Sequence, residues 1–275
     1  MFSKLLEYFQ YDFVVYAFIV GTLIALCSAM LGSVIVTKKM SFIGDGLSHI
    51  AFAASTVAMI SGISNNFIII LPLTFVVSLL VFRNRDDSKF PSDAILAVIS
   101  VAGLAFGYMY INLFSKSANV SGDVCGFLFG ATSILTLAVN QVITCCILSV
   151  LMIAVFVAFY NKIYAVTFDE TFAKASGTET GLYRFIIILI TDTIIVLATH
   201  LVGALLVTAL IVLPTISAIK LAYSFKGLVI TSTVLSVTGA LIGLSTAVVL
   251  GTPVGCTIVL VDMIIFALAC IFRRK

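Results

Sequence analysis

The chain has 275 residues, of which 62% are hydrophobic and 10% are charged, with 15 lysines and arginines against 12 aspartates and glutamates. Soluble domains carry about 25% charged residues, and the mean hydropathy of this chain is +1.26. A globule of this size could not hide so much apolar surface from water. The composition therefore excludes a soluble enzyme, a disordered chain and a nucleic-acid-binding protein, and it predicts an all-α polytopic membrane protein.

The apolar runs of the chain predict how many helices cross the membrane. A span needs about 20 apolar residues to cross about 30 Å of hydrocarbon. Nine runs approach this length, at residues 13–36, 47–63, 66–82, 92–114, 137–160, 184–200, 203–222, 227–250 and 254–272. Only a short turn separates the runs at 184–200 and 203–222, and Pro214 is a candidate break in the second of them. We therefore expect about nine membrane-spanning helices, with eight as the alternative.

The basic residues predict the orientation, because lysine and arginine accumulate on cytoplasmic loops. Only Lys4 and Lys116 fall on one side of the predicted membrane. All the others fall at every second boundary between runs: Lys38, Lys39, Arg83, Arg85, Lys89, Lys162, Lys174, Arg184, Lys220, Lys226, Arg273, Arg274 and Lys275. We therefore expect the N-terminus outside and the C-terminus in the cytoplasm, which requires an odd number of spans and agrees with nine.

Two predicted loops are longer than a simple connection. Residues 115–136 are expected outside and residues 161–183 inside. Within the inner loop a short helix is predicted from Thr167 to Ala175, because Thr167 is a candidate N-cap with Glu170 three residues later, and Gly177 can end the helix. We interpret this short helix as a docking element; the alternative is an amphipathic surface segment.

The segment MSFIGDGLSHIAF, residues 40–52, contains the strongest candidate site. Asp45 and His49 are four residues apart and share one face of a helix, at a membrane boundary where ionisable groups are expensive and usually functional. A carboxylate with an imidazole suits a divalent metal such as Zn²⁺ or Mn²⁺. Two ligands alone hold a metal weakly, which suits a site that must release its ion. The alternative is that Asp45 accepts the His49 N–H and the pair only joins two helices.

Further ionisable residues lie within the apolar runs. Asp192 and Asp262 have no charged neighbour in the sequence, and His200 ends the run that holds Asp192. Each is a candidate for lining a polar pathway or carrying protons. The alternative is that each acid is protonated or hydrogen-bonded and faces a neighbouring helix. Asp93, which closely follows Pro91, is expected instead in the first turn of a helix.

The motifs that are missing also restrict the function. The chain contains no GxxxxGK[ST] phosphate-binding loop, so we do not expect it to hydrolyse a nucleotide itself. It contains neither HExxH nor GxSxG. We therefore expect a protein that is not an enzyme.

Several spaced motifs run through nearly the whole chain. They are LGSVIVTKK at 31–39 with MSFIGDGLSHIAF at 40–52, SDA at 92–94, Asp123 ahead of LFG at 128–130, TFDETFAKASG at 167–177, VGALLVTALIVLP at 202–214, and PxGxxIVL at 253–260. Together these motifs resemble the ABC-type zinc/manganese permease family. Thr252 stands where that family usually has an acidic residue, and Asp192 and Asp262 are not features of its pattern.

The resemblance implies a permease architecture like that of the vitamin B12 importer, with a single transmembrane domain over residues 1–275 in a bacterial plasma membrane. It implies a homodimer on two copies of a separate cytoplasmic ABC ATPase, supplied by an extracytoplasmic metal-binding protein or lipoprotein. Asp45 and His49 match its metal-binding positions. The loop by which such a permease contacts its ATPase, the coupling loop, corresponds to about residues 161–183. Its chief residues are Phe168, Asp169, Glu170, Phe172, Ala173, Lys174, Ala175 and Gly177.

The resulting functional hypothesis is an importer subunit for divalent metal ions. Zinc is preferred over manganese because residues 41–49 look closer to the zinc-type members. The ion is the transported substrate, and no permanently bound cofactor is expected. One alternative is a permease for a chelate such as cobalamin, haem or a siderophore, which would not need Asp45 and His49; another is a proton-coupled secondary carrier. Four residues are further candidates for the pathway: Asp123, Asp192, His200 and Asp262.

Overall fold

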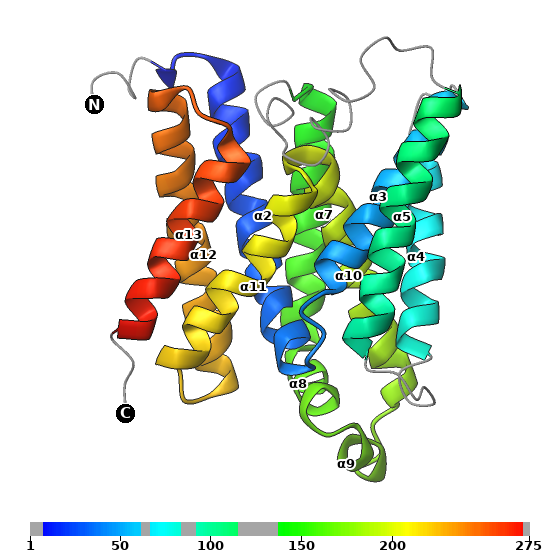
Figure 1. Cartoon of the computed structure of the whole chain (residues 1–275). Helices are drawn as coiled ribbons and strands as arrows, with labels where there is room; N and C mark the ends of the chain where they lie inside the picture. The colour runs from blue at the N-terminus through cyan, green and yellow to red at the C-terminus, as the bar shows by residue number, and fades with distance from the viewer. Residues whose placement is uncertain (1–7, 62–66, 84–91, 115–136, 272–275) are drawn as a thin grey trace.

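The computed structural model describes residues 8–61, 67–83, 92–114 and 137–271, and every regular element in these ranges is a helix. Figure 1 shows the helices as one bundle in which most run roughly parallel or antiparallel. The helices are α2 (Asp12–Thr37), α3 (Ile43–Ile60), α4 (Phe67–Arg83), α5 (Ser92–Phe114), α7 (Val139–Ala158), α8 (Tyr160–Phe168), α9 (Glu170–Ala175), α10 (Thr180–Val202), α11 (Ala204–Leu221), α12 (Phe225–Leu250) and α13 (Val254–Ile271).

All nine predicted apolar runs form helices, which confirms the prediction of an all-α polytopic membrane protein. In the described ranges, eight helices are long and apolar enough to cross a membrane. The ninth, α4, has 17 residues, with a shorter apolar stretch at Ile69–Val81. Whether α4 is included therefore decides between eight and nine membrane-spanning helices in the described ranges.

The predicted break at Pro214 is wrong, because α11 continues through this residue without interruption. The interruption lies at Gly203 instead, between the end of α10 and the start of α11. The φ of Gly203 is 105°, a backbone conformation that favours glycine, and this single residue joins the two helices. A proline inside a membrane helix is tolerated where neighbouring helices support the turn. The hydroxyl of Ser217 donates to the carbonyl of Leu213 beside it, whereas the Thr208 hydroxyl has no partner among the described residues.

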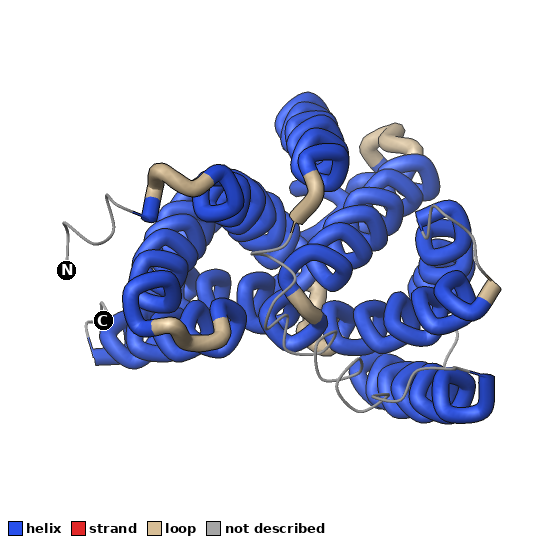
Figure 2. The backbone as a smooth tube through the Cα atoms, turned by 90° about the horizontal axis from the view of Figure 1, so that it is seen from above, coloured by secondary structure: helices blue, strands red, loops and turns tan. Residues whose placement is uncertain are grey.

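The helices form two groups that share a central layer. On one side α12 and α13 pack together and against α2 and α11, and on the other side α3 packs against α4 and α5 (Figures 1 and 2). α10 contacts helices of both groups, and α7 covers α2. The largest cluster of buried apolar side chains runs through α2, α3, α10 and α11, so the helix that carries Asp45 and His49 is anchored in the core.

Glycines allow several helices to approach closely. A methyl group at Gly32 of α2 would collide with the backbone carbonyl of Ile211 and the hydroxyl of Thr215, both in α11. A methyl group at Gly103 of α5 would lie 2.9 Å from the carbonyl carbon of His49 in α3. Small residues at such contacts are typical of membrane helix packing, because lipid offers no hydrophobic drive between helices. The spacing of α3 and α5 therefore depends on glycine.

We predict that Gly32→Ala separates α2 from α11 and destabilises the protein by about 1–3 kcal/mol, the usual range for overpacking a core. The measurement is thermal unfolding of the purified protein in detergent. Gly181→Ala is the matched control, because a methyl group at Gly181 has no other atom within 4 Å. Equal stability of the two variants would contradict the close contact between α2 and α11.

Candidate functional site

The turn between α2 and α3 places Asp45 within the bundle. α2 ends at Thr37, and Lys39 takes a left-handed φ of 57° while the N–H of Met40 donates to the carbonyl of Ile35. This arrangement is the Schellman ending of a helix, with lysine at the position where glycine is usual. α3 then begins part of the way along the bundle rather than at its end (Figure 1), and Asp45 lies in its first turn.

The side chains of Asp45 and His49 contact each other along one face of α3. Nε2 of His49 lies 3.3 Å from Oδ1 of Asp45, and the side chains are 11% and 33% exposed, respectively. This confirms that the two residues share a helix face. Because both residues belong to α3, their mutual contact does not by itself join two helices.

Ser100 of α5 completes the contacts of the Asp45 carboxylate. Its hydroxyl donates to Oδ2 of Asp45, so each carboxylate oxygen has one partner. Ser100 is 6% exposed and lies three residues before Gly103, on the face of α5 that contacts α3. The hydrogen bond to Ser100 is therefore what joins the pair to a second helix.

The free side of Asp45 opens into a groove between the start of α3 and α11. The groove has a volume of about 440 Å³ and is lined by residues that are mostly apolar: Ser41, Phe42, Asp45, Leu205, Thr208, Ala209, Val212 and Leu213. The hydroxyl of Thr208 lies close to Gly44, where a methyl group would be 3.2 Å from it. Asp45 is thus a charged group at the wall of a mostly apolar groove, with the hydroxyl residues Ser41 and Thr208.

The coordinating atoms of one chain are few. Nδ1 of His49 is buried without a hydrogen-bond partner in the described ranges, and no group of three or more histidine, cysteine, aspartate or glutamate side chains is found among the described residues. One copy of the chain therefore presents Asp45 and His49 as a two-ligand set, with the hydroxyls of Ser100 and Thr208 nearby.

The other predicted pathway residues are placed away from this pair. Asp192 is 2% exposed and faces α4, where Thr74 and Ser78 contact its carboxyl group. Asp262 is 2% exposed and packs against Gly239 of α12, with neither oxygen hydrogen-bonded among the described residues. The ring of His200 lies 4.9 Å from that of Phe67. Asp123 lies outside the described residues, and Asp93 is in the first turn of α5, as predicted.

The inner loop contains two helices, and the predicted N-cap is wrong. Thr167 is buried in α8, where its hydroxyl donates to the carbonyl of Ile163. The cap of α9 is Asp169, whose Oδ1 accepts the N–H of Phe172 at 2.9 Å. Aspartate is a stronger cap than threonine, and the chain before it continues α8. The predicted end at Gly177 is confirmed by its φ of 79° and by its N–H bond to the carbonyl of Lys174.

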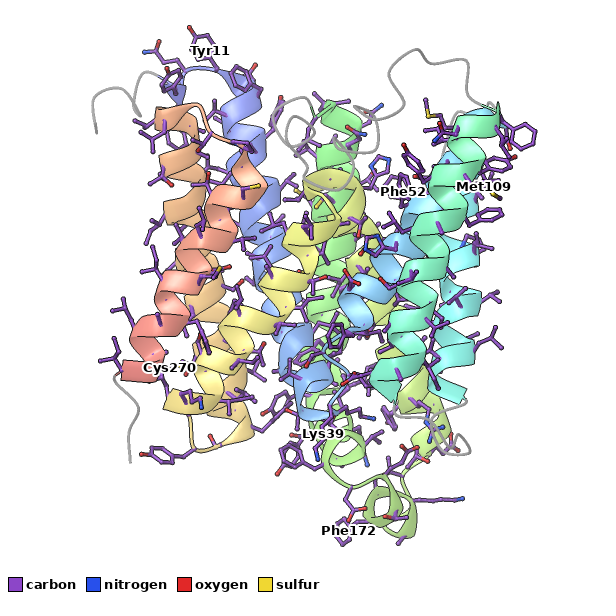
Figure 3. The ribbon with its side chains drawn as sticks, in the orientation of Figure 1. Tyr11, Lys39, Phe52, Met109, Phe172 and Cys270 are labelled. Carbon is purple, nitrogen blue, oxygen red and sulfur yellow. The ribbon has the colours of Figure 1, made fainter. Side chains whose placement is uncertain are left out.

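α9 projects beyond the ends of the spanning helices and is tied to one of them. Figure 3 shows Phe172 at its tip, where it is 69% exposed, and Phe168 in α8 is 57% exposed. Arg184, in the first turns of α10, forms an ion pair with Glu170, and its Nε also donates to the same carboxylate at 3.1 Å. α9 is thus an exposed element with an aromatic tip, fastened to α10.

Ser100 and Thr208 are site residues that sequence reasoning did not find. Both are hydroxyl residues inside apolar runs, and most such residues bond only to a carbonyl of their own helix. One sequence pattern could have indicated Ser100: Ser100, Gly103 and Gly107 are spaced so that they form a face of small residues on one helix. That face predicts close packing but not the helix that it meets.

A helical bundle with a carboxylate–imidazole pair on a groove and an exposed short helix at one end is the arrangement that the sequence predicts for a membrane transport protein. The sequence profile described as the ABC 3 transport family matches residues 10–273. The chain therefore belongs to the ABC 3 transport family, which confirms the resemblance to ABC-type metal permeases.

Individual relatives agree with this assignment. The chain is 28% identical to the high-affinity zinc uptake system membrane protein ZnuB of Buchnera aphidicola, over 91% of this chain and 94% of the relative. It is 26% identical to the manganese transport system membrane protein MntC of Listeria monocytogenes, over 97% and 92%. The solved structure of PsaBC from Streptococcus pneumoniae in complex with Fab has the same fold, with a TM-score of 0.87, 23% identity and coverage of 100% and 97%.

We predict that Asp169→Ala speeds hydrogen exchange of the Phe172 backbone N–H several-fold at neutral pH, because α9 loses its cap. Hydrogen bonds from the Thr171 hydroxyl and the Phe172 N–H hold the pKa of Asp169 below its usual value of 3.8. A depressed pKa means that the cap is complete above the unfolded pKa and is lost as the pH falls through the folded pKa. Thr171→Val is the control that keeps the Phe172 bond, and unchanged exchange in Asp169→Ala would refute the cap.

Proposed function

We propose that this chain is the permease subunit of an ABC importer that carries divalent metal ions, zinc first and manganese second, across a bacterial plasma membrane. The observation that supports this proposal best is the Asp45–His49 pair on the wall of a groove within the membrane-spanning bundle. Membership of the ABC 3 transport family and the named zinc and manganese relatives support it independently.

The separation of the two coordinating atoms is one that a zinc ion can bridge. Zinc binds imidazole nitrogen and carboxylate oxygen at about 2.0–2.2 Å in a tetrahedral arrangement, so two adjacent ligands lie about 3.3 Å apart. Nε2 of His49 and Oδ1 of Asp45 are 3.3 Å apart. The ion would therefore displace the shared proton and bind both atoms with little movement of either side chain.

A second copy of the chain would complete the site. Two ligands from each of two copies give the four that a tetrahedral ion requires, and rotation of one copy against the other would break the site and release the ion. This proposal combines Asp45 and His49 with the homodimer, and it treats the metal as cargo rather than as a resident cofactor.

The exposed α8–α9 element is proposed to bind a separate ABC ATPase subunit. The lysines and arginines of the described ranges lie in or near the helix ends on the same side as α9, which the positive-inside rule assigns to the cytoplasm. The described chain begins at the opposite end with α2 and finishes at the α9 end with α13 (Figure 1). The proposed orientation therefore has the N-terminus outside, where an extracytoplasmic metal-binding protein delivers the ion, and the C-terminus in the cytoplasm.

The two alternative functions make different demands on these residues. A chelate permease would retain transport without Asp45 and His49, since the chelator holds the metal. A proton-coupled secondary carrier would need no ATPase and would depend on Asp192 and Asp262, neither of which lines the Asp45 groove. Uptake measured with and without the ATPase separates the second alternative from the proposal.

We predict that the double variant Asp45→Ala/His49→Ala reduces zinc uptake in cells to background. This loss exceeds the about 10–100-fold that substitution of outer-shell partners causes, because the ligands themselves are removed. The measurement is accumulation of radioactive zinc, with manganese as a second ion, at matched expression. His200→Ala is the control for removal of an imidazole elsewhere. Undiminished uptake of free zinc and manganese by the double variant would contradict the proposal.

We predict that Ser100→Ala weakens zinc binding by about 10-fold, the lower end of the outer-shell range, because Asp45 loses the hydrogen bond that orients it. Isothermal titration of the protein in lipid nanodiscs measures this effect. The matched control is Ser48→Ala, since the Ser48 hydroxyl donates to the Asp45 backbone carbonyl of its own helix. If both variants bind zinc equally well, Ser100 does not orient the carboxylate.

A further inference from the structure

A buried carboxyl group joins α10 to α4. Asp192 of α10 is 2% exposed, and Thr74 and Ser78 of α4 are fully buried. The Thr74 hydroxyl oxygen lies 3.2 Å from Oδ2 of Asp192, and the Ser78 hydroxyl oxygen lies 3.1 Å from Oδ1. Thr74 and Ser78 are one turn apart, so one face of α4 contacts both oxygens of the carboxyl group.

The hydrogens available to this cluster favour a protonated carboxyl group. The Thr74 hydroxyl oxygen also lies 2.8 Å from the carbonyl of Ile70 and 3.1 Å from that of Leu71, and the Ser78 hydroxyl oxygen lies 2.9 Å from the carbonyl of Thr74. Each hydroxyl has a single hydrogen to donate, so two hydrogens face five acceptor contacts. A proton on Asp192 supplies a third hydrogen, which lets Thr74 keep its shorter bond to Ile70 while it accepts from the acid.

Charge in the surroundings does not favour the ionised form. The basic residues of α10 are Arg184 and His200, each eight residues from Asp192 and so about 12 Å away along the helix. The pair in α3 is turned toward Ser100 and the α11 groove, and no salt bridge to Asp192 is found within the described ranges. The charged residues of α4, α11, α2 and α8, which also pack against α10, are Arg83 of α4, Lys220 of α11, Asp12 at the start of α2, Lys38 just after its end, and Lys162 of α8. An unpaired anion within the hydrocarbon is expensive.

The cluster lies between the coupling element and the helix that carries Asp45. At the cytoplasmic end of α10, Arg184 holds Glu170 of α9. On the other side of the cluster, Val196 of α10 and Ile70 of α4 pack with residues of α3 in one buried apolar group, which includes Ala51 and Ala54. α10 thus contacts α3 directly as well as through α4, and a bond between α10 and α4 makes both helices move against α3 together when α9 displaces α10.

We propose that Asp192 is a neutral carboxylic acid that binds α10 to α4 through Thr74 and Ser78, and that this bond carries movement of α9 to α3 during transport. In this proposal, Asp192 binds a proton and positions α4 relative to α10. The second part of the proposal rests on the proposed function; the first part does not.

The protonation state is tested directly by infrared spectroscopy of the full chain in lipid at neutral pH. The expected result is a carbonyl-stretch band of a protonated carboxylic acid that disappears in Asp192→Asn. Asp262→Asn is the matched control, because Asp262 is equally buried but has no hydroxyl partner among the described residues, and the Asp192 band must survive in it. If Asp192→Asn instead loses only intensity in the bands of ionised carboxylates, Asp192 is charged in the wild-type protein and the proposal is overturned.

The coupling role is tested by uptake and ATP hydrolysis of the complex with its ATPase in liposomes. Asparagine can replace a neutral acid in this cluster, so we expect Asp192→Asn to keep uptake within about twofold, whereas Asp192→Leu lowers uptake at least about tenfold while ATP hydrolysis continues. Thr74→Val/Ser78→Ala should reproduce the leucine variant while it retains the acid, and it serves if Asp192→Leu does not fold.

Two results would overturn the coupling role: uptake lost equally in Asp192→Asn and Asp192→Leu, which would mean that the charge itself is needed, or uptake retained when the hydroxyls are removed. Failure of the proposed function is distinguishable from either, because the wild-type protein would then carry no metal. In that case the infrared result would still decide the protonation state.

Discussion

An ionisable side chain within a membrane-spanning bundle needs a partner for every charge, and the site described here depends on that requirement. The Asp45 carboxylate has one oxygen with His49 and the other with Ser100. The first partner is supplied by helical periodicity, and the second only by the close approach of α3 and α5. That approach exists because Gly103 leaves room for the backbone of His49. Displacement of one helix from the other would leave one carboxylate oxygen of Asp45 without its partner, so the packing of α3 and the chemistry of the site cannot be separated.

The same requirement explains how the two ends of the molecule are connected. Glu170 and Arg184 fasten the exposed α9 to α10, outside the hydrocarbon, where a full ion pair can be solvated. Deeper in the bundle α10 is fastened to α4 through hydroxyls and a carboxyl group, which suit an apolar medium when the carboxyl is neutral. α4 contacts α3 through an apolar group that contains Ile70, Ala51 and Ala54. The polarity of each connection thus follows its depth, and together they form a continuous path from α9 to the helix of Asp45 and His49.

Local patterns predicted much of this arrangement. The nine apolar runs became helices, and the spacing of Asp45 and His49 placed them on one face, because hydropathy and helical period are properties of short segments. The errors arose where neighbouring segments compete: α8 extends through Thr167, which leaves Asp169 as the cap of α9, and packing keeps α11 intact at Pro214. Ser100 could not be predicted as a partner of Asp45, because 55 residues separate them and no local signal shows which helices meet. The same holds for Asp192 and its hydroxyl partners.

The central claim is that Asp45 and His49 form the metal site of the permease, shared between two copies. X-ray absorption spectroscopy of the zinc-loaded protein in lipid nanodiscs tests it most directly. The account predicts a first shell of nitrogen and oxygen at about 2.0–2.2 Å without sulfur at about 2.3 Å, with imidazole scattering that disappears in His49→Ala. Sulfur ligands, or an unchanged spectrum in His49→Ala, would contradict it.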